Sequence, residues 1–238
     1  MDISSIASFY SSQQLLQTRQ LAPTDAVQKA FANSAARLDK ARESTGVQIS
    51  AYGQVKSGLV RIEDSGKSLA AAKPASTAAD IRKDLQALVS TYNATRNAAA
   101  GTEAGAARNV ADDLRRSVGN DSSRADLRVL GISRQRDGAL SLDSKALDTA
   151  LQSDLAGTRS AAGRIGGQLE QSASQSLSSK GGINSALTAL NARNQSIEAR
   201  QTQQQNLSNA SQQAVQQQSE RLSSSLSGIN SYQRIFSL

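Results

Sequence analysis

Apolar residues recur every three or four positions along most of the chain, the spacing that places them on one face of an α-helix. The most regular run follows Gly46 and comprises Val47, Ile49, Tyr52, Val55, Leu59, Ile62 and Leu69. A similar run precedes this glycine, from Val27 to Ala41. Before it stands Pro23, followed by a Thr-Asp pair, which predicts a helix break and a newly capped start. Residues 1–22 are therefore expected to form a separate N-terminal helix that needs a partner for its apolar face.

Four glycines fall within or beside the regular run, at Gly46, Gly53, Gly58 and Gly66. Each weakens a helix by about 1 kcal/mol relative to alanine. Their placement indicates either close contact with another helix or local bending. Simple tolerance of small residues in a long helix explains them equally well.

The middle of the chain contains several shorter elements. Residues 73–77 include the second proline and read as a linker, after which helices are expected over 78–99 and 106–118. Two short apolar runs, 127–132 and 138–142, flank a polar Asp-Gly turn and predict a β-hairpin. Asp143 is expected to cap the helix that follows, because its carboxylate can accept from the free amides of the first turn.

A coiled-coil pattern begins after Gly182. Ile183, Leu187, Leu190, Asn194 and Ile197 follow the alternating four-and-three spacing of such a seam. The seam continues less regularly at Leu207, Leu222, Leu226 and Ile229. Residues 195–218 are rich in Gln, Asn and Ser, and a solitary helix of that composition is marginal in water. The seam is therefore expected to close against the N-terminal positions Ile3, Ile6, Leu15 and Leu16, or against copies of itself; a disordered polar tail is the alternative.

These patterns predict a mainly α protein: an elongated helical bundle with long N- and C-terminal coiled-coil helices and one short β-hairpin. The expected organisation is an N-terminal leg helix over 1–22, a helical core over 23–182 with the hairpin near 127–142, and a C-terminal coiled-coil leg helix over 183–238. Only 38% of the 238 residues are hydrophobic and 3% are aromatic, so a large spherical core is not expected.

Composition narrows the chemistry. The chain has no Cys and no His, which removes thiolate and imidazole metal ligands and the commonest nucleophiles and bases. We therefore expect neither an enzyme nor a cofactor.

The net charge of +7 would suit nucleic acid, but the basic residues are interspersed with acids and few aromatic residues are available for stacking. No nucleic-acid partner is expected. The sequence also lacks an apolar stretch long enough for membrane insertion, and its start lacks the features of a cleaved signal peptide.

Three segments, in order, carry a resemblance to a known family: Ser44–Leu59, with Ile-Ser-Ala-Tyr-Gly-Gln at 49–54; Leu88–Asn93, with Val-Ser-Thr-Tyr-Asn at 89–93; and Gly131–Asp143, ending in Asp-Gly-Ala-Leu-Ser-Leu-Asp. Together they resemble the bacterial flagellar filament cap family, also called hook-associated protein 2. The resemblance implies a helical core, to which the chain returns through the Val-Ser-Thr-Tyr-Asn segment and a following β-hairpin. It also implies long terminal legs that mediate oligomerisation. It also implies two inserted β domains, for which residues 70–77 leave no room.

The resemblance implies a structural flagellar protein that is extracellular, exported without a cleaved signal peptide, and assembled at the distal filament end, where it assists flagellin insertion. The implied partners are other copies of the chain, flagellin or hook–filament junction proteins, and an export chaperone. A second hypothesis is a secreted or flagellum-associated coiled-coil adaptor without capping activity, since the inserted domains are missing.

Overall fold

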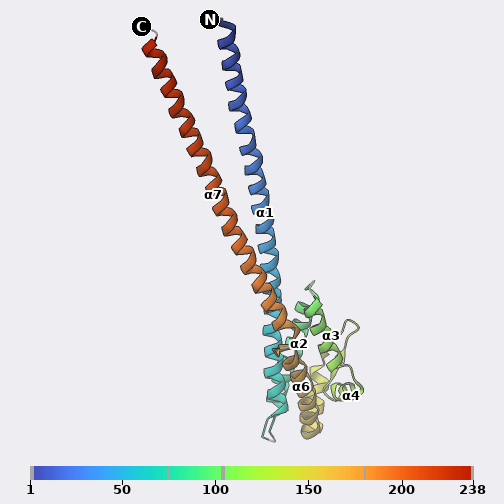
Figure 1. Ribbon diagram of the computed structural model, residues 1–238. Helices are drawn as coiled ribbons and strands as arrows, with labels where there is room; N and C mark the ends of the chain where they lie inside the picture. Colours follow the sequence, from blue (N-terminus) through green and yellow to red (C-terminus); the bar gives the residue numbers. More distant parts are fainter. Residues whose placement is uncertain (1–2, 74, 103–104, 180, 237–238) are drawn as a thin grey trace. The chain divides into compact units, whose positions relative to one another are not determined.

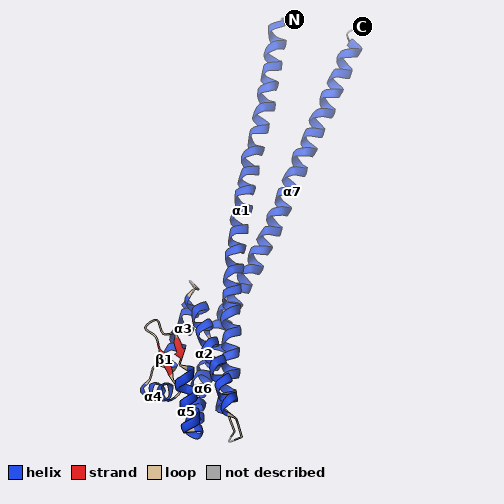
Figure 2. Ribbon diagram, turned by 180° about the vertical axis from the view of Figure 1, so that it is seen from behind, coloured by secondary structure: helices blue, strands red, loops and turns tan. Residues whose placement is uncertain are grey.

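The computed structural model describes the backbone of residues 3–73, 75–102, 105–179 and 181–236, and the side chains of these ranges except those of 3–24, 222 and 225–236. This part of the chain forms seven helices and two strands, so the mainly α prediction is confirmed (Figures 1 and 2). The elements are α1 (Ile3–Ala70), α2 (Ala78–Ala100), α3 (Gly105–Ser117), α4 (Asp121–Val129), β1 (Ile132–Arg134), β2 (Leu140–Leu142), α5 (Ser144–Ser153), α6 (Leu155–Leu177) and α7 (Gly182–Phe236).

Internal contacts divide the chain into two units. Unit 1 comprises Met1–Ser44 and Asn194–Leu238, and unit 2 comprises Thr45–Arg193. The two long helices α1 and α7 each contribute to both units. The contacts therefore group residues 23–44 with the C-terminal helix and residues 183–193 with the core.

The predicted break at Pro23 is wrong, because α1 runs without interruption from Ile3 to Ala70. A proline removes one backbone hydrogen bond from a helix and crowds the preceding turn. It leaves the bonds of the turns further away intact, so a helix that is long on both sides can continue through it.

Unit 2 has one hydrophobic core, to which all its helices and both strands contribute. The apolar face predicted for the run after Gly46 is buried from Tyr52 onward, while Val47 is 65% exposed. Helix α2 begins with a capping box, in which Thr77 and Asp80 each accept from the other's backbone amide. It buries Ile81, Leu85, Leu88, Val89 and Tyr92. The core thus forms where the sequence periodicity places apolar side chains.

The glycines of α1 serve different purposes. An added Cβ at Gly66 would lie 2.5 Å from the carbonyl oxygen of Gly166, and one at Gly166 would lie 2.8 Å from the carbonyl oxygen of Gly66. The backbones of α1 and α6 therefore touch at this crossing. At Gly58, an added Cβ would instead meet the side chain of Thr95 of α2. Nothing lies within 4 Å of such an atom at Gly46 or Gly53. Close helix contact explains two of the four glycines.

Gly166 and its neighbour Gly167 offer a matched test of this crossing. Gly166→Ala is expected to lower the free energy of unfolding by roughly 1–3 kcal/mol, the usual cost of overpacking. Gly167→Ala has open space around its new Cβ and is expected to raise it by about 0.5–1 kcal/mol, since alanine favours the helix. Urea unfolding of both variants measures the difference, and equal shifts would contradict the crossing.

The β-hairpin is confirmed, but its first strand is shorter than expected. β1 and β2 pair antiparallel, with Ile132 opposite Leu142 and Arg134 opposite Leu140. Residues 127–129, expected to be extended, instead end α4. Asn120 explains the difference, because its side-chain oxygen accepts from the amide of Ser123 at 2.7 Å and caps this helix. Asp143 caps α5 as predicted.

Candidate functional site

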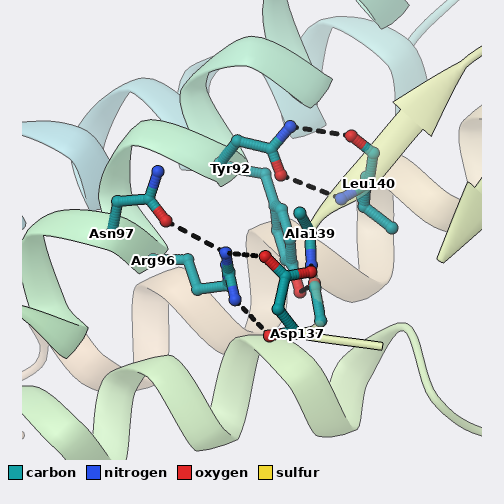
Figure 3. Close-up of polar contacts among 8 residues, drawn as sticks. Tyr92, Arg96, Asn97, Asp137, Ala139 and Leu140 are labelled. Atoms are coloured by element: carbon teal, nitrogen blue, oxygen red, sulfur yellow. Dashed lines mark hydrogen bonds and ion pairs between the residues drawn. The ribbon is translucent and has the colours of Figure 1, made fainter. Parts of the chain in front are cut away.

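The structure brings the second and third motif segments together in unit 2, where the hairpin docks on α2. Figure 3 shows this region, with Tyr92 of α2 beside Leu140 at the start of β2. The amide nitrogen of Asn93 donates to the carbonyl oxygen of Leu140 at 2.7 Å, and its oxygen accepts from the Leu140 amide at 2.9 Å. One side chain thus satisfies both backbone groups of Leu140, a buried residue. This pairing fixes the register of the hairpin against the helix.

Tyr92 makes the next contact, with the turn of the hairpin. Its side chain is buried, and its hydroxyl donates to the carbonyl oxygen of Gly138 at 3.1 Å. Burial raises the pKa of the Tyr92 hydroxyl, so the donor keeps its proton over the physiological range. Gly138 has a φ of 88°, in the left-handed region, and an added Cβ would lie 3.3 Å from the side chain of Arg115. Glycine is therefore the residue that fits this turn.

Arg96 completes the contact one turn further along α2 (Figure 3). It donates to the carboxylate of Asp137 at 3.0 Å and to the Asp137 carbonyl oxygen. The backbone amide of Ala139 also donates to this carboxylate, at 3.0 Å. That amide bond is the main reason why the pKa of Asp137 is lowered, and the Arg96 charge adds to it. Tyr92, Asn93 and Arg96 together form what we call the hairpin clamp.

The first motif segment, residues 49–54 of α1, lies in the same unit. Its Tyr52 is buried in the hydrophobic core that also holds Tyr92 and Leu140. The three segments that carry the resemblance therefore share one packed unit. The contacts of the clamp residues with the hairpin were not predicted from the sequence. The Tyr-Asn pair at 92–93, which places polar groups beside the buried face of α2, was the sequence feature that could have indicated them.

Within the described residues, no group of three or more His, Cys, Asp or Glu side chains could hold a metal ion. In the same part of the chain, no helix is both long enough and apolar enough to cross a membrane. The hydrogen bonds of Tyr92, Asn93 and Arg96 hold the hairpin against α2.

The predicted seam positions are distributed over both units. Ile183 is fully buried in the core of unit 2, and Leu187 and Leu190 pack against that core. Ile197 is buried in unit 1, whereas Leu207 is 54% exposed. The remaining positions have side chains outside those that the structure describes: Ile3, Ile6, Leu15, Leu16, Leu222, Leu226 and Ile229. Their pairing stays a prediction.

Polar contacts join the two helices of unit 1. Ser34 donates to the side chain of Gln204 at 3.0 Å, and Gln201 donates to Asp39 at 2.7 Å. Gln204 also donates to the carbonyl oxygen of Phe31. Residue numbers rise along α1 as they fall along α7, so the two helices run antiparallel. Glutamine side chains, which a leucine-based seam does not reveal, connect them.

An open groove lies beside these contacts in unit 1. It has a volume of about 370 Å³ and is lined by α1 and α7 residues that include Val27, Phe31 and Val215. Val27 and Val215 are both exposed. Gln and Ser side chains make up the rest of its lining.

Comparison with known protein families shows which family the chain belongs to. A family model described as flagellar hook-associated protein 2 C-terminus matches residues 102–231, more than half of the chain. The chain belongs to the hook-associated protein 2 family. The family resemblance is thereby confirmed. Of the three motif segments, the match contains the third, and it spans both strands of the clamped hairpin, α5, α6 and most of α7.

Membership of the hook-associated protein 2 family makes this a structural protein of the flagellum. Neither the curated proteins nor the solved structures contain a significant match to the chain.

Ile183 and Leu207 both lie on the predicted seam of this hook-associated protein 2 family member, but only Ile183 is buried. Ile183→Ala is expected to cost roughly 2–5 kcal/mol of unfolding free energy, because it removes a fully buried side chain. Leu207→Ala removes an exposed one and is expected to change that energy by less than about 0.5 kcal/mol. Thermal unfolding followed by circular dichroism measures both, and similar losses would contradict the assignment of Ile183 to the core.

Proposed function

We propose that this protein assembles at the distal end of the flagellar filament as a cap-like structural protein and assists the insertion of flagellin. The family match over residues 102–231 carries this proposal. The clamped hairpin supports it, since it joins two motif segments that are distant in the sequence into one packed unit. The mechanism is mechanical: a firm helical unit is held in place while flagellin subunits fold and insert.

The helix pair of unit 1 supplies the means of attachment in this proposal. Its open groove and its glutamine side chains suit contact with other helices, because side-chain amides can both donate and accept hydrogen bonds. The partners are other copies of the chain, flagellin or hook–filament junction proteins, and an export chaperone. Export proceeds without cleavage of a signal peptide, and the protein then functions outside the cell.

One observation favours a second function. Helix α1 ends at Ala70 and α2 begins at Ala78, so the connection is too short for the inserted β domains that the family resemblance implies. A cap that covers the filament end would be expected to need them. The alternative is a flagellum-associated coiled-coil adaptor that binds flagellar partners through unit 1 without capping.

Immunogold labelling of intact flagellated cells distinguishes the two functions. The cap-like function predicts label confined to filament tips, and loss of filament growth when the gene is deleted. Label elsewhere on the flagellum, with filaments of normal length in the deletion strain, would support the adaptor. Label on the cell body alone would contradict both.

A further inference from the structure

The loop-rich side of unit 2 has arginines without acidic partners. Every described carboxylate between residues 105 and 137 is already in an ion pair with an arginine: Asp112, Asp113, Asp121, Asp126 and Asp137. Among the described residues, Arg128, Arg134 and Arg136 make no hydrogen bond or ion pair through their side chains. All three are exposed. We call them the hairpin arginines.

The hairpin arginines occupy neighbouring elements. Arg134 ends β1, and Arg136 lies in the turn that follows. Arg128 lies in the last turn of α4, which is in contact with β1. Because the clamp holds the hairpin on α2, these charges stand on a fixed support. Val129 beside them is 47% exposed.

A surface of opposite charge lies at the crossing of α1 and α6. Glu63 and Asp64 come from α1, and Glu170 comes from α6, where its Cβ packs against Gly66. Lys67 bonds to Glu63 at 2.5 Å. Its pKa is raised by that bond first, and then by the charges of Glu63, Glu170 and Asp64. Glu63 is thus paired with Lys67, whereas Asp64 and Glu170 make no ion pair among the described residues; we call these three groups the crossing carboxylates.

The elements that carry the two surfaces lie on different sides of unit 2. Figures 1 and 2 show α1 on one side of this unit and α4 with the hairpin on the other, with α2 and α6 between them. A single copy therefore cannot neutralise its own hairpin arginines with its crossing carboxylates. Val60, one helical turn before Asp64, is 41% exposed, so each charged surface also carries one exposed valine.

We propose that the hairpin arginines of one copy bind the crossing carboxylates of a second copy. This inference rests on the proposed function, in which the protein assembles with itself, and it names the surfaces involved. Opposite charges on two sides of one unit produce a head-to-tail contact, which closes into a ring if the rotation between copies allows it. The exposed valines meet within the contact while the charges set its register and its rate of formation.

Self-association of the purified full-length chain tests the contact, measured by sedimentation velocity. Arg134→Glu combined with Arg136→Glu, or Asp64→Arg combined with Glu170→Arg, is expected to raise the dissociation constant at least about tenfold. Lys83→Glu combined with Lys145→Glu makes the same change of charge as the arginine pair, but on α2 and α5, and is expected to leave the dissociation constant unchanged. Circular dichroism confirms that each variant remains folded.

Mixing the two charge-reversed variants gives the sharper result. Each variant alone is expected to associate with itself weakly, but an equimolar mixture is expected to form mixed complexes, because each variant then offers the charge that the other needs. A monomeric wild-type chain, unchanged self-association of the variants, or absence of mixed complexes would overturn the proposal. So would binding of a duplex DNA oligonucleotide that the Arg134→Glu, Arg136→Glu variant loses while self-association persists.

These outcomes are separate from those of the labelling experiment. Label at filament tips together with unchanged self-association of the variants would overturn the contact alone. Mixed complexes in solution together with label away from the tips would overturn the cap-like function alone.

Discussion

Replacing Asn93 by alanine is expected to lower the free energy of unfolding by about 2–4 kcal/mol, because two backbone groups of a buried residue lose their partners. The amide and carbonyl of Leu140 are satisfied by this one side chain, at 2.9 and 2.7 Å. Leu140 is only 4% exposed, so water cannot readily replace the lost bonds. Urea unfolding of the purified chain measures the change.

Two further variants make the reason for this loss testable. Asn97→Ala removes the same residue type one turn along α2, where the side chain is exposed and bonds only to Arg96. Its effect is expected to be below about 0.5 kcal/mol. Asn93→Asp keeps the acceptor for the Leu140 amide but places a carboxylate oxygen against the Leu140 carbonyl, so it is expected to be nearly as harmful as alanine. A tolerated aspartate would show that the clamp is not built on paired donors and acceptors.

The elements with strong local signals were predicted from the sequence. The hairpin follows from its Asp-Gly turn, and α5 follows from Asp143, whose carboxylate accepts from the amides of Lys145 and Ala146. The apolar periodicity from Tyr52 to Leu69 gave the buried face of α1 in unit 2. In each case, the residues that determine the element are close together in the sequence.

What local patterns could not predict depends on partners distant in the sequence. The glycines at 58 and 66 were open to three explanations until Thr95 and Gly166 were seen beside them. Residues 127–129 begin the apolar run that predicted a strand, but they lie in α4, the helix that Asn120 caps. Asn93 is an ordinary polar residue in a helix until the hairpin is placed next to it.

The apolar residues of the coiled-coil pattern that begins at Ile183 have two different surroundings along α7. Its first turns bury Ile183 in the core of unit 2, and its later turns face α1 in unit 1 through Gln201 and Gln204. A helix that serves a core and then a leg keeps one spacing, since both need a buried stripe. Spacing alone therefore does not reveal where the core ends and the leg begins.

Replacing Arg164 by alanine is the second change with a large expected effect. Arg164 donates to both carboxylate oxygens of Asp126, at 2.9 and 2.6 Å, and joins α6 to α4. The Asp126 side chain is 8% exposed, while that of Arg164 is 53% exposed. Arg164→Ala leaves a buried carboxylate without its cation, and an unfolding loss of about 3 kcal/mol is expected.

Because Asp126 is more buried than Arg164, the two single substitutions are expected to differ in their effect. Asp126→Ala leaves the half-exposed guanidinium of Arg164 in water, so it is expected to cost less than Arg164→Ala, and the double variant is expected to cost less than the sum of the two. Arg124→Ala breaks the exposed pair with Asp121 and is expected to cost no more than about 0.5 kcal/mol. Urea unfolding of the four variants gives the coupling energy. If Arg164→Ala and Arg124→Ala cost the same, the ion pair does not hold α4 on α6, and α4 would then lack the fixed position on which the contact through Arg128 depends.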